Sequence, residues 1–200
     1  MTSWVLIPVK APGTGKQRLA AALTEAQRTR LVEAMLERVV AAARASPLVS
    51  TVCVVSPEGR ALPPGVELLH DTGAGLNALS DALASLARRG ARRVSVIAAD
   101  LPLVTHEDVT ALVEAAGDSG VALGTDHTGT GTNALSLPLP VGFGLHFGPG
   151  SLERHLAEAR ARALPVQVVR RPGLAFDVDE PADLAALLAR GDPRYGFLAR

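Results

Sequence analysis

Residues 93–117 read RVSVIAADLPLVTHEDVTALVEAAG, which passes from a β-branched apolar run through a short loop into a helical pattern. The apolar run predicts a strand over 93–98, buried on both faces as in a parallel sheet. Thr105 followed by Asp108 has capping-box spacing and predicts a helix over 106–117. The stretch therefore predicts a βα unit.

The same alternation extends along the chain in both directions. Further strands are expected at 3–9, 50–55, 66–69, 120–123, 133–137 and 165–169, and further helices at 25–45, 75–89, 151–162 and 181–190. This pattern predicts an α/β fold with three layers, in which helices cover both faces of a mainly parallel, mixed sheet. We expect a single domain over residues 1–200, with ligands beyond the carboxyl ends of the strands.

Composition favours a small-molecule partner. Twenty basic residues balance twenty acidic ones, so no general field attracts nucleic acid or an anionic membrane. The lone cysteine, Cys53, excludes a disulfide framework within one chain. The first residues lack a signal-peptide pattern, and no apolar run approaches the ~18 residues of a membrane helix. We expect a cytoplasmic protein and leave a homodimer open.

The first loop, residues 8–19, contains both lysines of the chain. Its GTGK run resembles a phosphate-binding P-loop but fails the pattern, because Lys10 replaces the first glycine and Gln17 follows the lysine. Lys10, Lys16 and Arg18 nevertheless make a polyphosphate a plausible ligand. The simpler interpretation is a solvated loop.

The segment HDTGAGLNAL, residues 70–79, carries a rival pattern. Gly73, Gly75 and Ala78 have the spacing of a dinucleotide-binding fingerprint, with Asp100 further along the chain. Against this interpretation, the segment does not belong to the first βαβ unit, and the chain has no room for a second catalytic domain.

Three aspartates suggest a metal site. Asp100 follows the strand at 93–98, and Asp177 and Asp179 are two apart in an extended segment, so they share one face. Two carboxylates that face one way repel each other unless a cation or hydrogen-bond donors lie between them, and Mg²⁺ is commonly held by such aspartates beside phosphates. Helix capping by Asp179 or Glu180 is the alternative, but it leaves Asp177 unexplained.

Two glycine-rich stretches lie close together, GTGTNAL at 129–135 and HFGPGS at 146–151. Glycine exposes backbone N–H groups, and Thr or Ser adds a hydroxyl donor, a mixture that suits an oxyanion. Ser151 is the expected N-cap of the next helix. Arg154 and His155 in its first turns become favourable if an anion lies at that terminus. Together these loops suggest the joining of a nucleoside triphosphate to a second phosphorylated or carboxylated molecule.

The chain resembles the guanylyltransferases of coenzyme F420 biosynthesis, which act on 2-phospho-L-lactate or phosphoenolpyruvate. The resemblance covers about 180 residues and rests on IPVK with GKQRL, AML, GLNAL, ADLP, GTGTNAL, FGPGS and DVDEPADL in that order. Two positions depart from the family pattern. His127 stands where an arginine commonly precedes GTGTN, and Glu180 replaces a threonine.

The resemblance implies a nucleotidyltransferase fold of the glycosyltransferase-A type and transfer of GMP from GTP to a three-carbon phospho-acid. It implies Mg²⁺ on Asp100, Asp177 and Asp179. The acid would contact Thr132, Gly148 and Ser151. Lys16 and Arg18 would neutralise the departing pyrophosphate, with Lys10, Gly75 and Asn77 on the nucleotide.

Two interpretations from other classes stay open, a dinucleotide-dependent oxidoreductase and a non-catalytic nucleotide-binding domain. The chain is rich in Ala, Arg and Gly and has only two lysines, a composition typical of GC-rich coding sequences. Within the family, this composition favours phosphoenolpyruvate over 2-phospho-L-lactate as the substrate.

Overall fold

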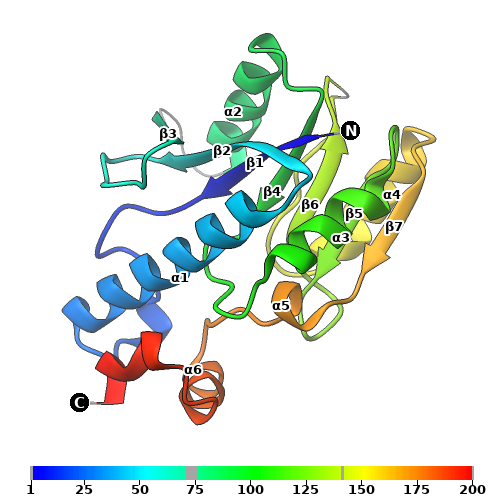
Figure 1. Ribbon diagram of the computed structural model, residues 1–200. Coiled ribbons are helices and arrows are strands. Elements are labelled where there is room, and N and C mark those ends of the chain that lie inside the picture. Colours follow the sequence, from blue (N-terminus) through cyan, green and yellow to red (C-terminus); the bar gives the residue numbers. More distant parts are fainter. Residues whose placement is uncertain (1, 71–75, 141, 200) are drawn as a thin grey trace.

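The computed structural model describes residues 2–70, 76–140 and 142–199. Within them, seven strands form one sheet in the order β3-β2-β1-β4-β6-β5-β7 (Figure 1). The strands are β1 (Ser3–Pro8), β2 (Val49–Ser56), β3 (Val66–His70), β4 (Arg93–Ile97), β5 (Val121–Thr125), β6 (Thr132–Pro138) and β7 (Val166–Val169). β6 runs antiparallel to both its neighbours, β4 and β5, and the other pairs are parallel. The predicted mixed, mainly parallel sheet is confirmed.

Helices cover both faces of this sheet. They are α1 (Glu25–Ala45), α2 (Leu76–Arg88), α3 (His106–Ala116), α4 (Ser151–Ala161), α5 (Pro172–Ala175) and α6 (Pro181–Ala189). α1 and α3 pack on the face that carries Val5 and Ile7, whereas α2 and α4 pack on the face that carries Leu6. This alternation along one strand, with apolar side chains on both faces, is why the strand patterns look continuously hydrophobic.

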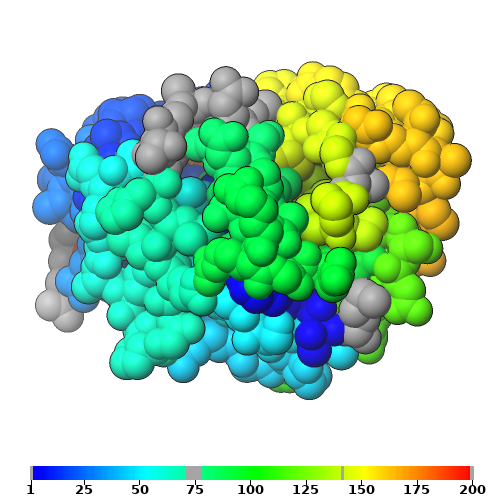
Figure 2. Space-filling model, turned by 90° about the horizontal axis from the view of Figure 1, so that it is seen from above, coloured from blue at the N-terminus to red at the C-terminus, as the bar shows by residue number. Residues whose placement is uncertain are grey.

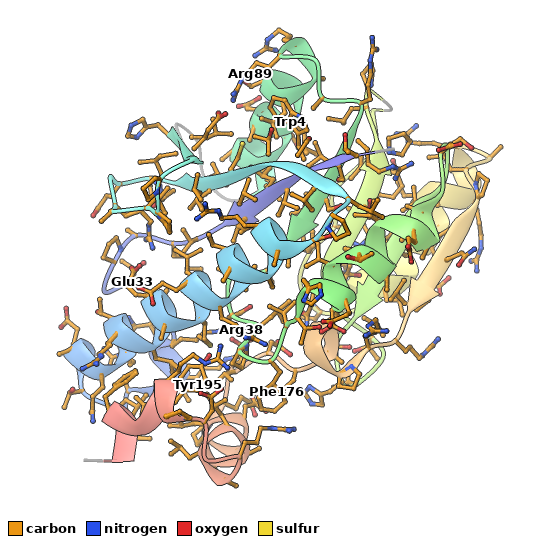
Figure 3. The ribbon with its side chains drawn as sticks, viewed as in Figure 1. Trp4, Glu33, Arg38, Arg89, Phe176 and Tyr195 are labelled. Atoms are coloured by element: carbon orange, nitrogen blue, oxygen red, sulfur yellow. The ribbon has the colours of Figure 1, made fainter. Side chains whose placement is uncertain are left out.

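Figure 2 looks from above onto the side of the molecule where α2 lies. There, the green atoms of α2 lie between the teal atoms around β3 and the yellow and orange atoms toward α4 and β7. Arg89, just after α2, places its guanidinium 5.2 Å from the centre of the Trp4 ring in β1 (Figure 3). This cation–π contact helps to join α2 to the sheet.

The predicted capping box at Thr105 is confirmed, and α1 begins with a second capping box. The Thr24 hydroxyl accepts from the backbone N–H of Gln27 at the start of α1, and Thr105 accepts from Asp108 at the start of α3. Three short elements were not predicted, namely the 3-10 helices η1 (Gln17–Leu19) and η2 (Pro193–Ala199), and α5. Each is too short to show a clear hydrophobic period.

The C-terminal elements form a third apolar cluster at one end of α1. Val178, Leu187 and Tyr195 pack there with residues of α1, and Tyr195 is almost fully buried (Figure 3). The Tyr195 hydroxyl donates to the carbonyl oxygen of Pro102 at 3.5 Å. The C-terminal segment therefore supports the loop that follows β4, next to Asp100.

Candidate active site

The strand order reverses between β1 and β4, because β2 and β3 lie beyond β1 and β6, β5 and β7 lie beyond β4. In open α/β sheets, ligands bind in the crevice at this switch point, outside the carboxyl ends of the strands. The loop after β1 contains Lys10 and Lys16, and the loop after β4 contains Asp100. Residues far apart in sequence thus meet at one site.

Lys16 has an unusual backbone conformation, with φ 55° and ψ 41°. Non-glycine residues adopt this left-handed region at a cost, and such strain persists where the surroundings enforce it. Its side chain, 8% exposed, places Nζ 2.5 Å from Asp100 Oδ2 and 2.8 Å from Asp179 Oδ1. Burial alone would lower the pKa of Lys16, but the two carboxylates outweigh it and the pKa is raised.

Asp177 and Asp179 flank Val178, which is fully buried. The predicted sharing of one face by the two aspartates fits this alternation. Burial raises the pKa of Asp177, and the charge of Asp100 raises it further, although the Asn133 amide donates to Asp177 Oδ1 at 3.3 Å. Burial also tends to raise the pKa of Asp179, but Lys16 reverses the effect and the net pKa is lowered.

The three aspartates predicted to hold a metal therefore lie around one point in the fold. Among the described residues, however, no three His, Cys, Asp or Glu side chains are arranged to hold a metal ion as they stand. The Lys16 ammonium lies between Asp100 and Asp179. The donor set suits Mg²⁺, since it consists of carboxylates and already holds a cationic group.

The other predicted basic residues are more exposed. Lys10 is exposed, and its carbonyl accepts from Arg60 Nη2 at 2.9 Å. Arg60 also pairs at 2.9 Å with Glu33 of α1; Glu33 is labelled on this helix in Figure 3. The Arg18 side chain is 72% exposed and lies 3.4 Å from Glu180. The loop is thus anchored through Lys16 and Arg60, while Lys10 and Arg18 face solvent.

A cavity of about 440 Å³ opens at this site. Its lining includes Lys10 and Lys16 from the first loop, the carboxylates Asp100 and Asp179, and Phe147 and Gly148 from the HFGPGS stretch. This volume is within the range of small-molecule sites. Gly148 therefore lies at the same cavity as Lys16 and Asp100, as its predicted role requires.

The GTGTN stretch already holds an anion, the side chain of Asp126. Asp126 Oδ1 accepts from the backbone N–H groups of Thr130 at 3.0 Å and Gly131 at 2.9 Å, and Oδ2 accepts from Thr128 Oγ1 at 2.8 Å. A Cβ on Gly131 would lie 2.8 Å from Asp126 Oδ2, which explains the glycine. The expectation that these backbone groups receive a substrate anion is corrected, because short polar side chains often satisfy such turns internally.

Thr132 and Ser151 both have buried side chains. Thr132 Oγ1 lies 3.0 Å from Nδ1 of His155. The predicted N-cap role of Ser151 is wrong, since Gly150, with φ 67°, is the N-cap and Ser151 is the first helical residue. Ser151 Oγ is buried without a hydrogen-bond partner among the described residues, a costly state for a polar atom.

Arg154 and His155 need no bound anion to explain them. Arg154 Nη2 donates to the carbonyl of His146 at 2.9 Å, and His155 is buried as a partner of Thr132. Sequence reasoning missed Asp126 and Asn133 as site-building residues, and it gave His155 a role beside an anion instead of its contact with Thr132. Only the proximity of Asp126 to GTGTN offered a clue.

The remaining residues singled out in the sequence are Gly75, Asn77 and His127. Gly75 lies outside the described residues, as does the side chain of Asn77, which is in the first turn of α2. His127 Nδ1 lies 3.8 Å from Asp177 Oδ1, so this departure from the family pattern is at the site.

Across the part of the chain that the structure describes, no helix is sufficiently long and apolar to span a bilayer.

Comparison with solved structures supports the fold. A structure described as a nucleotide-diphospho-sugar transferase from Desulfovibrio desulfuricans aligns with a TM-score of 0.78 at 18% identity, covering 100% of this chain and 95% of that one. A 2-C-methyl-D-erythritol 4-phosphate cytidylyltransferase from Thermus thermophilus aligns with a TM-score of 0.51 at 23% identity, covering 95% and 100%. The predicted nucleotidyltransferase fold is confirmed.

Sequence comparison identifies the family. A phosphoenolpyruvate guanylyltransferase of Sphaerobacter thermophilus is 41% identical over 94% of this chain and 93% of its own length, and one of Rubrobacter xylanophilus is 40% identical over 98% of both. The family model described as guanylyl transferase CofC like matches residues 3–198. This match replaces the dinucleotide-binding oxidoreductase interpretation. The chain belongs to the CofC-like guanylyl transferase family.

Proposed function

We propose that this protein transfers GMP from GTP to phosphoenolpyruvate, with release of pyrophosphate, in coenzyme F420 biosynthesis. The observation that carries the proposal is the convergence of Lys16, Asp100 and Asp179 at a cavity that Phe147 and Gly148 also line. Relatives about 40% identical over nearly the whole chain are phosphoenolpyruvate guanylyltransferases.

The reaction needs positioning and charge neutralisation more than covalent help from the protein. A phosphate oxygen of the acid would attack the α-phosphorus of GTP. The bond from that phosphorus to the bridging oxygen would break, and pyrophosphate would leave with the electron pair. The attacking phosphate is already ionised at neutral pH, so the step requires no general base.

Lys16 would neutralise charge on the triphosphate. Its buried ammonium group lies at the carboxyl ends of β1 and β4, and its raised pKa keeps it protonated. Arg18, which is exposed beside Glu180, would meet the leaving pyrophosphate at the edge of the site. Lys10, Gly75 and Asn77 remain proposed nucleotide contacts.

Asp100, Asp177 and Asp179 would hold Mg²⁺. Bound there, the ion would supply positive charge to the phosphates. Lys16 would then exchange its two carboxylate partners for phosphate oxygens. The acid would lie against Thr132, Gly148 and Ser151. Contact with Ser151 Oγ requires a rotation of this side chain or a shift of the neighbouring loop, because the atom is covered in the structure.

An assay of pyrophosphate release tests the proposal. Purified protein with GTP and Mg²⁺ is given phosphoenolpyruvate, 2-phospho-L-lactate or no acid. Release with phosphoenolpyruvate supports the proposal. Release only with 2-phospho-L-lactate would replace the acid but keep the reaction, and no release with either would point to a non-catalytic nucleotide-binding domain.

A further inference from the structure

One buried ring connects the two glycine-rich stretches. His155 is 0% exposed and extends from α4 between the start of β6 and the segment before α4. Its Nε2 accepts from the backbone N–H of His146 at 2.9 Å, and its Nδ1 lies 3.0 Å from Thr132 Oγ1. The rings of Phe143 and Phe147 pack against it, with centroids 6.0 and 5.2 Å away.

These contacts define the tautomer. A ring nitrogen that accepts from an N–H group carries no proton of its own, so the neutral ring must carry its proton on Nδ1. Burial lowers the pKa of His155 to about 4, with a further contribution from His146 and Arg154, so the ring is neutral near pH 7. Nδ1–H therefore donates to Thr132 Oγ1.

This donation leaves the hydroxyl proton of Thr132 available. Thr132 Oγ1 accepts from His155, and among the described residues no other hydrogen bond to its hydroxyl is present. The same ring holds the backbone of His146, which directly precedes the cavity-lining residues Phe147 and Gly148. His155 thus holds both the Thr132 side chain and the backbone that leads into the cavity lining.

We propose that His155 is a positioning residue for the acid substrate, which acts by orienting the Thr132 hydroxyl so that its proton is donated to an ionised oxygen of the acid. The inference rests on the proposed function. The ligand that it concerns is a small phosphorylated carboxylate, and GTP is not affected.

Two substitutions separate positioning from simple packing. His155→Gln can reach the His146 N–H with its side-chain oxygen but has no donor at the Nδ1 position. His155→Asn keeps a donor near Nδ1 but cannot reach His146. Thr132→Val removes the hydroxyl with little change in shape. His106→Gln is the control, because His106 is half exposed at the start of α3 and pairs with Glu107.

The test is a double-mutant cycle on steady-state constants for both substrates. We expect His155→Gln to raise KM for phosphoenolpyruvate about tenfold, as loss of one hydrogen bond to an ionised group would, with KM for GTP within about twofold. In the Thr132→Val background, His155→Gln should add less than about twofold. The inference would be overturned if the effects of the two substitutions on KM for the acid multiplied in the double variant. It would also be overturned if His155→Gln raised KM equally for both substrates or left KM for the acid unchanged.

If His155→Gln does not fold, His155→Asn decides. It should keep KM for the acid within about threefold of wild type, since it retains the donor to Thr132. A rise as large as that of Thr132→Val would contradict the role. Wild-type protein that is inactive with every phospho-acid would reject the proposed function itself, whereas active wild type with these contrary results would reject only the role of His155.

Discussion

The ammonium group of Lys16 lies 2.5 Å from Oδ2 of Asp100, a residue 84 positions away in the sequence. The contact exists because β1 and β4 are neighbours in the sheet, so the loops at their carboxyl ends meet. It joins the group proposed to neutralise phosphate to a group proposed to hold Mg²⁺. Each partner therefore serves as the counter-charge of the other until substrates arrive.

Asp177→Asn should abolish GMP transfer, with at least a hundredfold loss, while leaving the thermal midpoint of metal-free protein unchanged or higher. The pKa of Asp177 is raised by burial and by Asp100, so its charge is destabilising in the absence of a cation. Asp118→Asn is the control and should keep full activity, because Asp118 lies in the loop before β5, at the end of the strands opposite the site. A lower midpoint that parallels the loss of activity would contradict this account.

Asp179→Asn should also abolish transfer, but its effect on stability should have the opposite sign. Asp179 pairs with Lys16 and its pKa is lowered, so the variant loses a favourable interaction. Because the Asp179 side chain is 51% exposed, we expect a loss of no more than about 1 kcal/mol. Thermal denaturation of both variants side by side measures the contrast, and equal midpoints would refute it.

Ser151→Ala should weaken binding of the acid roughly tenfold without lowering stability. Ser151 is not the N-cap of α4, and its hydroxyl is buried without a partner among the described residues, so removal costs no existing hydrogen bond. The measurements are KM for each substrate and the thermal midpoint. A midpoint that falls together with an unchanged KM for the acid would show that the hydroxyl serves the fold alone.

Stability should fall as the pH is lowered from about 6.5 to about 4, in part because of His155. Burial lowers the pKa of this residue from 6.5 to about 4, so in this range the unfolded chain binds a proton that the folded protein does not. The contribution of His155 to the free energy of unfolding is complete above the pKa of the unfolded chain and is on the order of 3 kcal/mol.

His155→Gln removes that contribution, so the difference in unfolding free energy between wild type and variant should shrink as the pH falls. Urea denaturation at several pH values between about 4.5 and about 7.5 measures the difference. If the unfolding free energies of the two proteins changed with pH in parallel, His155 would not be the source of this pH dependence. His106→Gln, at an exposed position, should follow the wild-type curve.

The layout of the fold could be predicted from the sequence because its patterns are local and strong. The strand at 93–97 and the helix at 106–116 carry a dense apolar run and a capping box, and both form within a residue of the expected bounds. The strand order could not be predicted, because no pattern in the sequence indicates that β6 inserts between β4 and β5.

The site could be predicted in its residue types but less well in its contacts. Asp100, Asp179 and Lys16 were each expected there, yet their mutual ion pairs depend on the meeting of distant loops. The GTGTN loop was expected to hold a substrate anion, but Asp126, only a few residues earlier, accepts from the amides of Thr130 and Gly131. Ser151 was expected to cap α4, but Gly150 accommodates the left-handed turn that an N-cap serine cannot adopt as easily.

The most direct test of the central claim is the release of pyrophosphate from GTP by purified wild-type protein with Mg²⁺ and phosphoenolpyruvate. The account predicts release that requires the acid and the metal together, with formation of a guanylylated phosphoenolpyruvate in equal amount. Folded protein that binds GTP but releases no pyrophosphate with phosphoenolpyruvate or 2-phospho-L-lactate would contradict it.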